Sequence, residues 1–316
     1  MVNVIGGYGE LQFEASDQSF FDNAIALQSA RACLYLFLKT VQAKKIYLPD
    51  YICDSLYLSL ENLNIEVKSY PLTEKLEPTN VVELASGEYF LLVNYFGMSD
   101  QIIDKWIFLL DEKKVIVDNS QSIYSKAKDN IATIYSPRKF IGIPDGGFIF
   151  SDIELKKPDV FYPGENFCKH LLYRCSDKAE EGYEFYIDAE KALEDFYPKK
   201  MSVLSSKIIS SIDWSIVKKK RLANFKGLEE KFYSLNEFNF PVDEFVPLCY
   251  PLKLDLNVEA LHVQLVKEKI FTPRYWPSSI ENDWYRNTLF LPIDERLSLT
   301  DINRMIDSIL NFLRLK

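Results

Sequence analysis

Apolar residues in the first half of the chain recur at two spacings, one typical of helices and one typical of buried strands. Residues 29–40 place apolar side chains on one helical face behind Ser29, a residue type that caps helices. The expected strands are 45–49, 65–69, 89–93 and 115–117, and the further expected helices are 54–63 and 101–110. Helices that alternate with apolar strands predict a mostly parallel α/β sheet.

The second half changes its pattern around a turn at residues 136–147, which is rich in residues that break regular structure. This turn lies between two expected strands, 131–135 and 147–150. The later elements expected are helices at 179–196, 202–211, 213–232, 258–267 and from residue 300, a strand at 248–254 and an extended segment at 272–277. We therefore expect a large sheet domain over residues 20–200 and a small α+β domain over residues 201–316, against which residues 1–19 pack.

Charge and composition exclude several classes of protein. The formal net charge is −9 and no run of Lys or Arg reverses it locally, so nucleic acid is not an expected partner. No apolar stretch approaches the roughly 20 residues that a membrane-spanning helix needs, and the first residues lack a signal-peptide pattern. We expect no membrane partner and a cytoplasmic location. Five scattered cysteines and two histidines predict neither a metal site nor a disulfide framework.

Four segments carry a resemblance when they are taken in their order along the chain. They are residues 27–34, 47–53, 115–122 and 134–140, the last followed by Asp145, Gly146 and Gly147. In this order they resemble the DegT/DnrJ/StrS sugar-aminotransferase family of fold-type-I enzymes, which depend on pyridoxal 5′-phosphate (PLP). The resemblance covers nearly the whole chain. It implies a three-layer αβα large domain with a mostly parallel sheet, plus a small α+β C-terminal domain.

Two residues of these segments are expected to carry the chemistry. Lys139 aligns with the family's Schiff-base lysine, whose amine bonds the cofactor aldehyde and then shuttles a proton; burial near other cations would lower the pKa of that amine as required. Its segment alone also fits a solvated loop lysine. Asp118 ends an apolar strand, so its carboxylate would project from the carboxyl edge of the sheet. The resemblance implies that Asp118 holds the pyridine nitrogen protonated, and the alternative is a turn residue that closes a strand.

The cofactor's phosphate is expected at the start of the first helix. A helix N-terminus offers free backbone N–H groups and about half a positive charge to a phosphate, and Ser29, Ala30 and Arg31 open this helix. The family usually has Gly-Thr at the positions of Ala30 and Arg31, so a hydroxyl is lost here and a guanidinium is gained. Ser136 would add its hydroxyl to the same phosphate. A structural helix capped by Ser29 is the alternative.

Three further residues are expected near the cofactor ring. Gln121 resembles the family residue that lies near the phenolic oxygen of the cofactor. Cys53 stands where many members place an aromatic side chain against the ring, and Tyr51 is a second candidate for that place. Burial as a small hydrophobic residue is the alternative for Cys53.

The resemblance also suggests substrate contacts and a homodimer. Arg138 and Arg274 are candidates for binding a carboxylate or a diphosphate, and Trp276 belongs to a segment that resembles the one closing over the substrate. For both arginines an ordinary surface position is the alternative. Residues 198–202 resemble a loop that reaches across the family's dimer, although Pro198 replaces the usual asparagine and Lys200 keeps a positive charge nearby.

The resemblance implies an aminotransferase that moves an amino group from L-glutamate to a nucleotide-linked keto-sugar. One alternative is another PLP-dependent reaction on an amino acid, such as elimination or desulfuration. A second alternative is a non-catalytic scaffold of the same fold, which the departures at Arg31, Cys53 and Pro198 would suit. The presence of both Lys139 and Asp118 favours catalysis, and Lys139 argues against the family's dehydratase branch, which has histidine there.

Overall fold

The computed structural model describes residues 7–14, 16, 21–239, 244–276 and 283–314. Residues 1–6, 15 and 17–19 of the expected N-terminal packing segment lie outside these ranges, as does Pro277 at the end of the expected extended segment. Among the described residues, Ser16 donates from its backbone N–H to the carbonyl oxygen of Ser210 at 2.6 Å, and Glu10 lies 3.5 Å from Lys207. The N-terminal segment therefore contacts the helix that holds these two residues.

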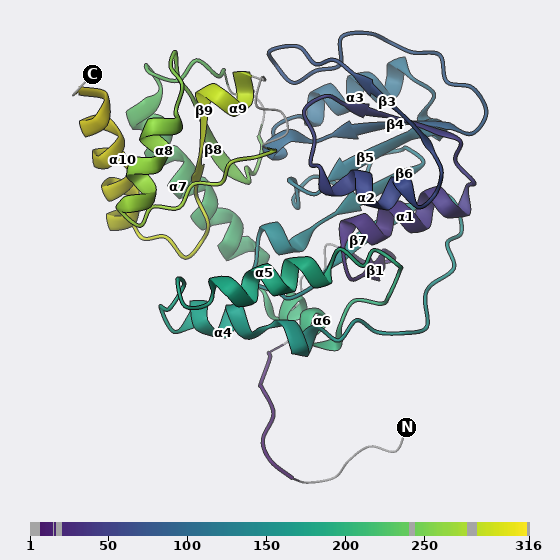
Figure 1. The fold of residues 1–316 in the computed structure, drawn as a ribbon, viewed down its shortest axis with the longest axis horizontal. Coiled ribbons are helices and arrows are strands. Elements are labelled where there is room, and N and C mark those ends of the chain that lie inside the picture. Colours follow the sequence, from purple (N-terminus) through teal and green to yellow (C-terminus); the bar gives the residue numbers. More distant parts are fainter. Residues whose placement is uncertain (1–6, 15, 17–20, 240–243, 277–282, 315–316) are drawn as a thin grey trace.

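The centre of the molecule is a mixed sheet of seven strands in the order β1-β7-β6-β5-β4-β2-β3 (Figure 1). Its strands are β1 (Ile25–Leu27), β2 (Lys45–Pro49), β3 (Glu66–Tyr70), β4 (Glu88–Val93), β5 (Val115–Asn119), β6 (Ala132–Tyr135) and β7 (Gly147–Ser151). Strands β6, β5, β4, β2 and β3 pair in parallel, whereas β7 runs antiparallel to both β6 and β1. The predicted mostly parallel sheet is confirmed.

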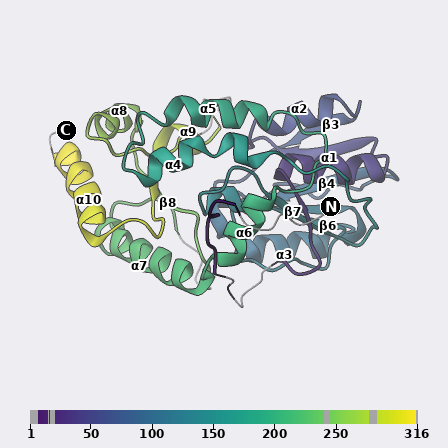
Figure 2. The same ribbon diagram turned by 90° about the horizontal axis from the view of Figure 1, so that it is seen from below.

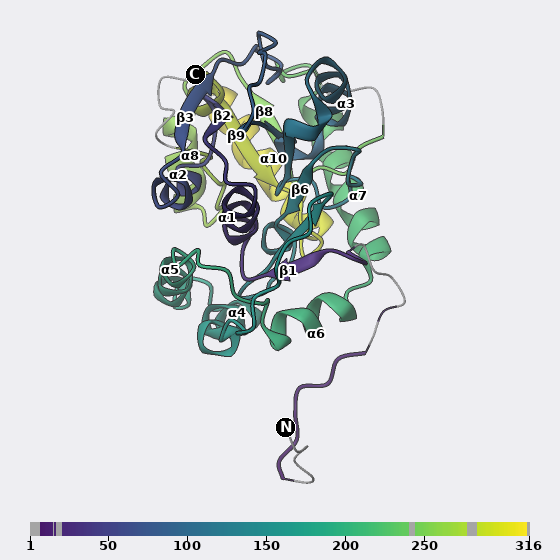
Figure 3. The same ribbon diagram turned by 90° about the vertical axis from the view of Figure 1, so that its right-hand side faces the viewer.

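Helices cover both faces of this sheet. The α-helices within the described ranges are α1 (Ala30–Thr40), α2 (Ser55–Glu61), α3 (Asp100–Leu109), α4 (Lys169–Cys175), α5 (Tyr183–Ala192), α6 (Val203–Ser211), α7 (Trp214–Phe232), α8 (Glu259–Lys267), α9 (Asp283–Asn287) and α10 (Leu299–Arg314). Figure 3 shows α1 and α2 on one side of the sheet and α3 on the other. The expected three-layer arrangement is therefore present.

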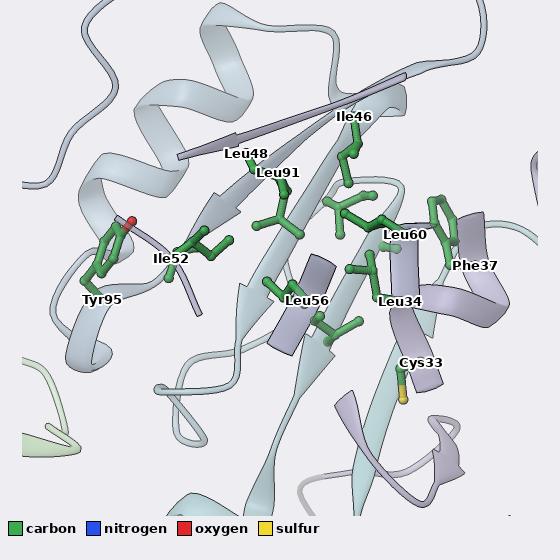
Figure 4. Close-up of a cluster of buried hydrophobic side chains, with 14 of the residues drawn as sticks. Cys33, Leu34, Phe37, Ile46, Leu48, Ile52, Leu56, Leu60, Leu91 and Tyr95 are labelled. Atoms are coloured by element: carbon green, nitrogen blue, oxygen red, sulfur yellow. The ribbon is translucent and has the colours of Figure 1, made fainter. Parts of the chain in front are cut away.

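The side chains of the central strands alternate between the two faces, as a period of two requires. In β4, Leu91 packs in the cluster that includes α1 and α2, whereas Phe90 and Leu92 pack with α3. Figure 4 shows the first cluster, in which Leu34 of α1 and Leu56 of α2 lie over the sheet. Strands buried on both faces read as continuous apolar runs, which is why the sequence signalled them clearly.

The C-terminal part builds a second core around a two-stranded antiparallel sheet of β8 (Cys249–Lys253) and β9 (Thr288–Pro292). Helices α7, α8 and α10 contribute to this core, and Figure 2 shows it at the end of the molecule opposite the large sheet. The sequence predicted β8 but missed its partner β9, together with β1, α4 and α9. The proposed domain boundary at residue 200 stays a prediction. Beyond that boundary, Ile209 of α6 packs in a cluster with Phe148 of β7. Within the described ranges, no helix has the length and apolar content to cross a membrane.

The two edges of the large sheet are protected in different ways. At one edge, residues 199–201 run beside β1, where Gln28 donates its backbone N–H to Lys199 at 3.2 Å and Met201 donates to Ala26 at 3.2 Å. At the other edge, β3 carries exposed residues along most of its length, including Glu66 and Lys68.

Candidate active site

The N-terminus of α1 is fixed against the start of β7. Ser29 caps the helix by accepting from the backbone N–H of Ala32 at 3.2 Å, and the N–H of Gly146 donates to the carbonyl of Gln28 at 2.7 Å. A Cβ atom on Gly147 would lie 2.3 Å from the carbonyl carbon of Ser29 and 2.4 Å from the nitrogen of Ala30. Glycine is therefore required at position 147, because the first peptide of α1 lies directly against it.

Two polar side chains lie at the carboxyl end of β5, Asp118 within the strand and Gln121 just after it. Asp118 is 8% exposed and its Oδ1 accepts from the backbone N–H of Ser120 at 2.8 Å. Gln121 is buried, and its Oε1 accepts from the backbone N–H of Phe96 at 2.9 Å. The other end of that amide, Nε2, is buried with no hydrogen-bond partner among the described residues. Gln121 therefore presents a fixed and unmatched donor.

Lys139 ends a short 3-10 helix, η3 (Pro137–Lys139), that follows β6. Its backbone N–H donates to the carbonyl of Ser136 at 3.2 Å. The burial that we expected for this lysine is wrong for the single chain, where the side chain is exposed. The reason is its place at the end of a surface turn, with cavities on both sides of it.

One of these, here called the inner cavity, has a volume of about 170 Å³ and lies at the carboxyl ends of the central strands. It brings together ten of the twelve residues predicted to form the site. They are Ser29, Ala30, Arg31, Cys53, Asp118, Gln121, Ser136, Arg138, Lys139 and Trp276. Segments more than a hundred residues apart in sequence thus converge on one small space.

The other two predicted residues, Tyr51 and Arg274, do not line this cavity. Tyr51 is fully buried, with its ring centroid 4.4 Å from that of Trp276, so Trp276 lies at the wall in its place. Arg274 forms an ion pair with Glu259 at 3.5 Å and its guanidinium lies 4.3 Å from the ring centroid of Tyr285. Neither side chain lines the inner cavity of the single chain, and their contacts with cofactor and substrate stay predictions.

Two guanidinium groups and one carboxylate meet on the wall of the inner cavity. Arg138 forms an ion pair with Glu190 of α5, and both residues line the cavity beside Arg31. Burial lowers the pKa of Arg31; Glu190 acts in the opposite direction, and the like charge of Arg138 lowers it further. The sequence did not signal Glu190, because a glutamate on a helix is ordinarily solvated.

A larger space, here called the outer cleft, has a volume of about 510 Å³ and lies on the other side of η3. It shares Ser136, Arg138, Lys139 and Glu190 with the inner cavity. The rest of its wall comes from residues 140–143, α4, α5, α7, the start of β8, the segment after α8 and the segment after β9. The lysine therefore stands between a small cavity and a cleft large enough for a small-molecule ligand.

Asp145 ties the turn after η3 to the start of α6. It is fully buried and accepts from the backbone N–H of Ser202 at 2.7 Å, from the Ser202 hydroxyl at 2.5 Å and from the Ser205 hydroxyl at 2.6 Å. Burial raises the pKa of Asp145 against the lowering effect of these hydrogen bonds. This carboxylate thus positions the two glycines that face α1.

The segment expected to reach across a dimer lies beside β1 in its own chain. Lys200 pairs with Leu27 in a β-bridge, and its ammonium lies 5.2 Å from the ring centroid of Phe161. Neither Pro198 nor Lys200 lines the inner cavity or the outer cleft of the same chain. In the parts of the chain that the structure describes, no group of three or more His, Cys, Asp or Glu side chains could hold a metal ion.

No protein-family model and no curated protein sequence matches the chain. Solved structures do match it over most of its length. They include the aminotransferase TlmJ from Streptoalloteichus hindustanus, with a TM-score of 0.64, 12% identity and coverage of 93% of this chain and 86% of that one. A DegT DnrJ EryC1 StrS aminotransferase from Brucella abortus gives a TM-score of 0.61 at 17% identity, covering 92% of this chain and 85% of that one.

Spr1654 from Streptococcus pneumoniae, described as a sugar aminotransferase and solved in a PLP form, gives a TM-score of 0.62 at 11% identity, with 90% and 85% of the two chains covered. The chain has the fold-type-I aminotransferase fold. At these identities the likeness establishes the fold alone. Within the fold-type-I frame, the inner cavity lies at the carboxyl ends of β5 and β6, where α/β sheets ordinarily bind their ligands.

Proposed function

We propose that the chain is a PLP-dependent aminotransferase that moves an amino group from L-glutamate to a nucleotide-linked keto-sugar. One observation carries this proposal. A lysine amine, a buried carboxylate, an unmatched amide donor and a helix N-terminus all face one cavity, through Lys139, Asp118, Gln121 and the first residues of α1. A non-catalytic scaffold has no need of that combination.

The residues present fit the phosphate and the polar edge of PLP. The backbone N–H groups at the start of α1 and the Ser136 hydroxyl would bind the phosphate, and the guanidinium of Arg31 would add a positive charge. The unmatched Nε2 of Gln121 would donate to the phenolic oxygen. Two residues of the cavity wall, Cys53 and Trp276, remain candidates for contact with the ring.

PLP, when bound, supplies an aldehyde that takes up an amine and a ring that withdraws electrons from the carbon bearing that amine. Lys139 would provide the amine that holds the cofactor and, once released, would move the proton at its Nζ. Asp118 would hold a proton on the ring nitrogen with its carboxylate. The position of Lys139 between the inner cavity and the outer cleft lets one amine serve both the cofactor and an incoming substrate.

We further propose that the outer cleft binds the substrates, with Arg138 at its junction with the inner cavity as the contact for a carboxylate or diphosphate. A homodimer in the cytoplasm completes the proposal. The exposure of Lys139 in the single chain supports a dimer, because a partner subunit would supply the missing cover. Light scattering should then give about twice the chain mass of 36.8 kDa, and a fully active monomer would contradict it.

The proposal is tested by the colour of the purified protein and its response to an amino donor. The protein should bind PLP and turn yellow, and adding L-glutamate should bleach that absorbance as the cofactor is converted to its amine form. Nucleotide-linked keto-sugars, screened by mass spectrometry against the amine-loaded protein, should then restore it. A colourless protein that takes up no PLP would support the scaffold alternative instead.

A further inference from the structure

Arg221 of α7 is a fixed cation on the wall of the outer cleft. It is 2% exposed, its Nε donates to the carbonyl of Pro247 at 3.3 Å and its Nη2 donates to the carbonyl of Leu248 at 2.5 Å. The guanidinium carbon lies 4.8 Å from the ring centroid of Phe140, which holds the group from one face. These contacts leave Nη1 buried, with no hydrogen bond to any residue that the structure describes.

Glu295 faces this nitrogen without closing a hydrogen bond to it. Its Oε2 lies 3.6 Å from Nη1 of Arg221, which is longer than the roughly 2.7–2.9 Å of a charge-assisted hydrogen bond. This oxygen is also buried and has no hydrogen-bond partner in the described part of the chain. The neighbouring Asp294 and Arg296 pair with each other at 2.7 Å. A donor and an acceptor thus stand side by side, each with an unmade bond.

Both residues line the same cleft as Lys139. An ammonium group would be attracted by Glu295 but repelled by Arg221, and a carboxylate would meet the opposite pair of forces. A hydroxyl group satisfies both residues, because it donates to Oε2 and accepts from Nη1.

We infer that Arg221 and Glu295 form a subsite that binds one hydroxyl group of the acceptor substrate. This inference rests on the proposed function, and it deepens it: the acceptor is a polyhydroxylated molecule, held in the outer cleft at a point separate from the charged group that Arg138 binds. The pair favours an uncharged hydroxyl group over a second carboxylate, because Glu295 would repel the carboxylate.

The test is a binding cycle on the purified PLP-loaded protein, with dTDP-glucose and its monodeoxy analogues as probes and calorimetry as the readout. Wild type should lose about tenfold or more in affinity when the hydroxyl at this subsite is removed from the probe. In Glu295→Gln the same removal should cost little, because the charged acceptor is gone. Glu230→Gln, an exposed carboxylate on α7, is the matched control and should behave as wild type.

Arg221→Lys provides a second arm, because it keeps the charge and removes Nη1. Unfolding midpoints of all variants show which are folded, and Glu295→Gln carries the test if Arg221→Lys is not. The inference is overturned if no probe binds wild type, if wild type binds every deoxy analogue equally, or if Glu295→Gln leaves the discrimination intact. In the second and third cases the pair holds only water.

The same preparations separate this inference from the proposed function. PLP content and conversion of the cofactor by L-glutamate are measured on wild type before any probe is added. A wild-type protein without PLP uptake contradicts the proposed function. Normal uptake and conversion with no coupling between the probe hydroxyl and Glu295 contradicts the subsite alone.

Discussion

The inner cavity and the outer cleft share η3 but are built in different ways. The inner cavity takes most of its polar groups from strand ends and a helix start in residues 29–139, all held by the large sheet. The outer cleft also draws on α4, α5, α7, β8 and the segments after α8 and β9, which belong to several layers of the molecule. The carboxyl edge of the sheet therefore positions the proposed cofactor site, and the elements around the outer cleft shape the proposed substrate site.

Lys139→Ala should have the largest effect, because it removes the one group proposed to serve both the inner cavity and the outer cleft. Covalent PLP attachment and turnover should both be lost, a fall in rate of roughly a thousandfold or more. Borohydride reduction of wild type, followed by peptide mapping, should place the cofactor on the peptide containing Lys139. Lys126→Ala, at an exposed position, is the control, and label on any other lysine would sink the assignment.

Asp118→Asn tests whether the inner cavity alone controls the chemical step. Asparagine keeps an oxygen for the Ser120 N–H but loses the negative charge, so the protein should fold and bind PLP while amino transfer slows by about a hundredfold or more. The measurement is single-turnover conversion of the cofactor by L-glutamate, with Asp129→Asn as an exposed control. Near-equal rates in wild type and Asp118→Asn would mean that Asp118 only closes a turn.

Asp145→Asn tests whether the inner cavity depends on the hydrogen bonds that link Asp145 to the start of α6. Asparagine replaces one buried acceptor oxygen by an NH₂ group, which cannot accept the hydrogen bond that Ser202 or Ser205 donates there. The free energy of unfolding should therefore fall by about 2 kcal/mol at pH 7. Urea unfolding of the variant, of wild type and of the exposed control Asp188→Asn measures this fall. Loss of stability without any loss of PLP affinity would separate the anchor from the cavity.

The same pair of proteins has a predicted pH dependence. Because burial raises the pKa of Asp145 in the folded protein, the folded state binds a proton more tightly than the unfolded chain between the ordinary value of 3.8 and the raised one. The stability advantage of wild type over Asp145→Asn should therefore grow as the pH falls through that window. A shrinking advantage would show that the hydrogen bonds outweigh burial.

Arg31→Ala is expected to have the smallest effect, because it removes one positive charge and leaves the N-terminus of α1 in place. The backbone N–H groups of α1 remain, so PLP affinity should weaken by only about tenfold. Equilibrium titration with PLP measures it, and Arg174→Ala, an exposed arginine of α4, is the control. An unchanged affinity would mean that Glu190 already neutralises Arg31.

The sequence predicted the elements that carry strong local patterns. The range expected for β2 matches Lys45–Pro49, and α1 begins directly after its predicted cap Ser29. The three-residue β1 and the short β9 were missed because their existence depends on partners far away in the chain, Gly147 to Ile149 in the case of β1. The local pattern of apolar and polar residues does not predict pairing with strands that are distant in the sequence.

The same limit applies to the site. Ser29 and Asp118 were predicted because each lies at the start or end of a recognisable element, and Lys139 was predicted from its place in the four-segment resemblance. Glu190 and Glu295 look like surface carboxylates in the sequence, and only the fold turns them toward a cavity. Lys139 was expected to be buried, but its side chain is exposed in the single chain.

The two protected edges of the large sheet bear on how the protein behaves at high concentration. An unpaired strand edge is a template for another chain, and aggregation commonly begins there. Beside β1 that template is already occupied by residues 199–201, while exposed charges such as Glu66 and Lys68 make β3 a poor surface for strand addition. The segment that holds Lys200 thus also protects this edge against fibril-like association, so changes that detach it from β1 should lower colloidal stability.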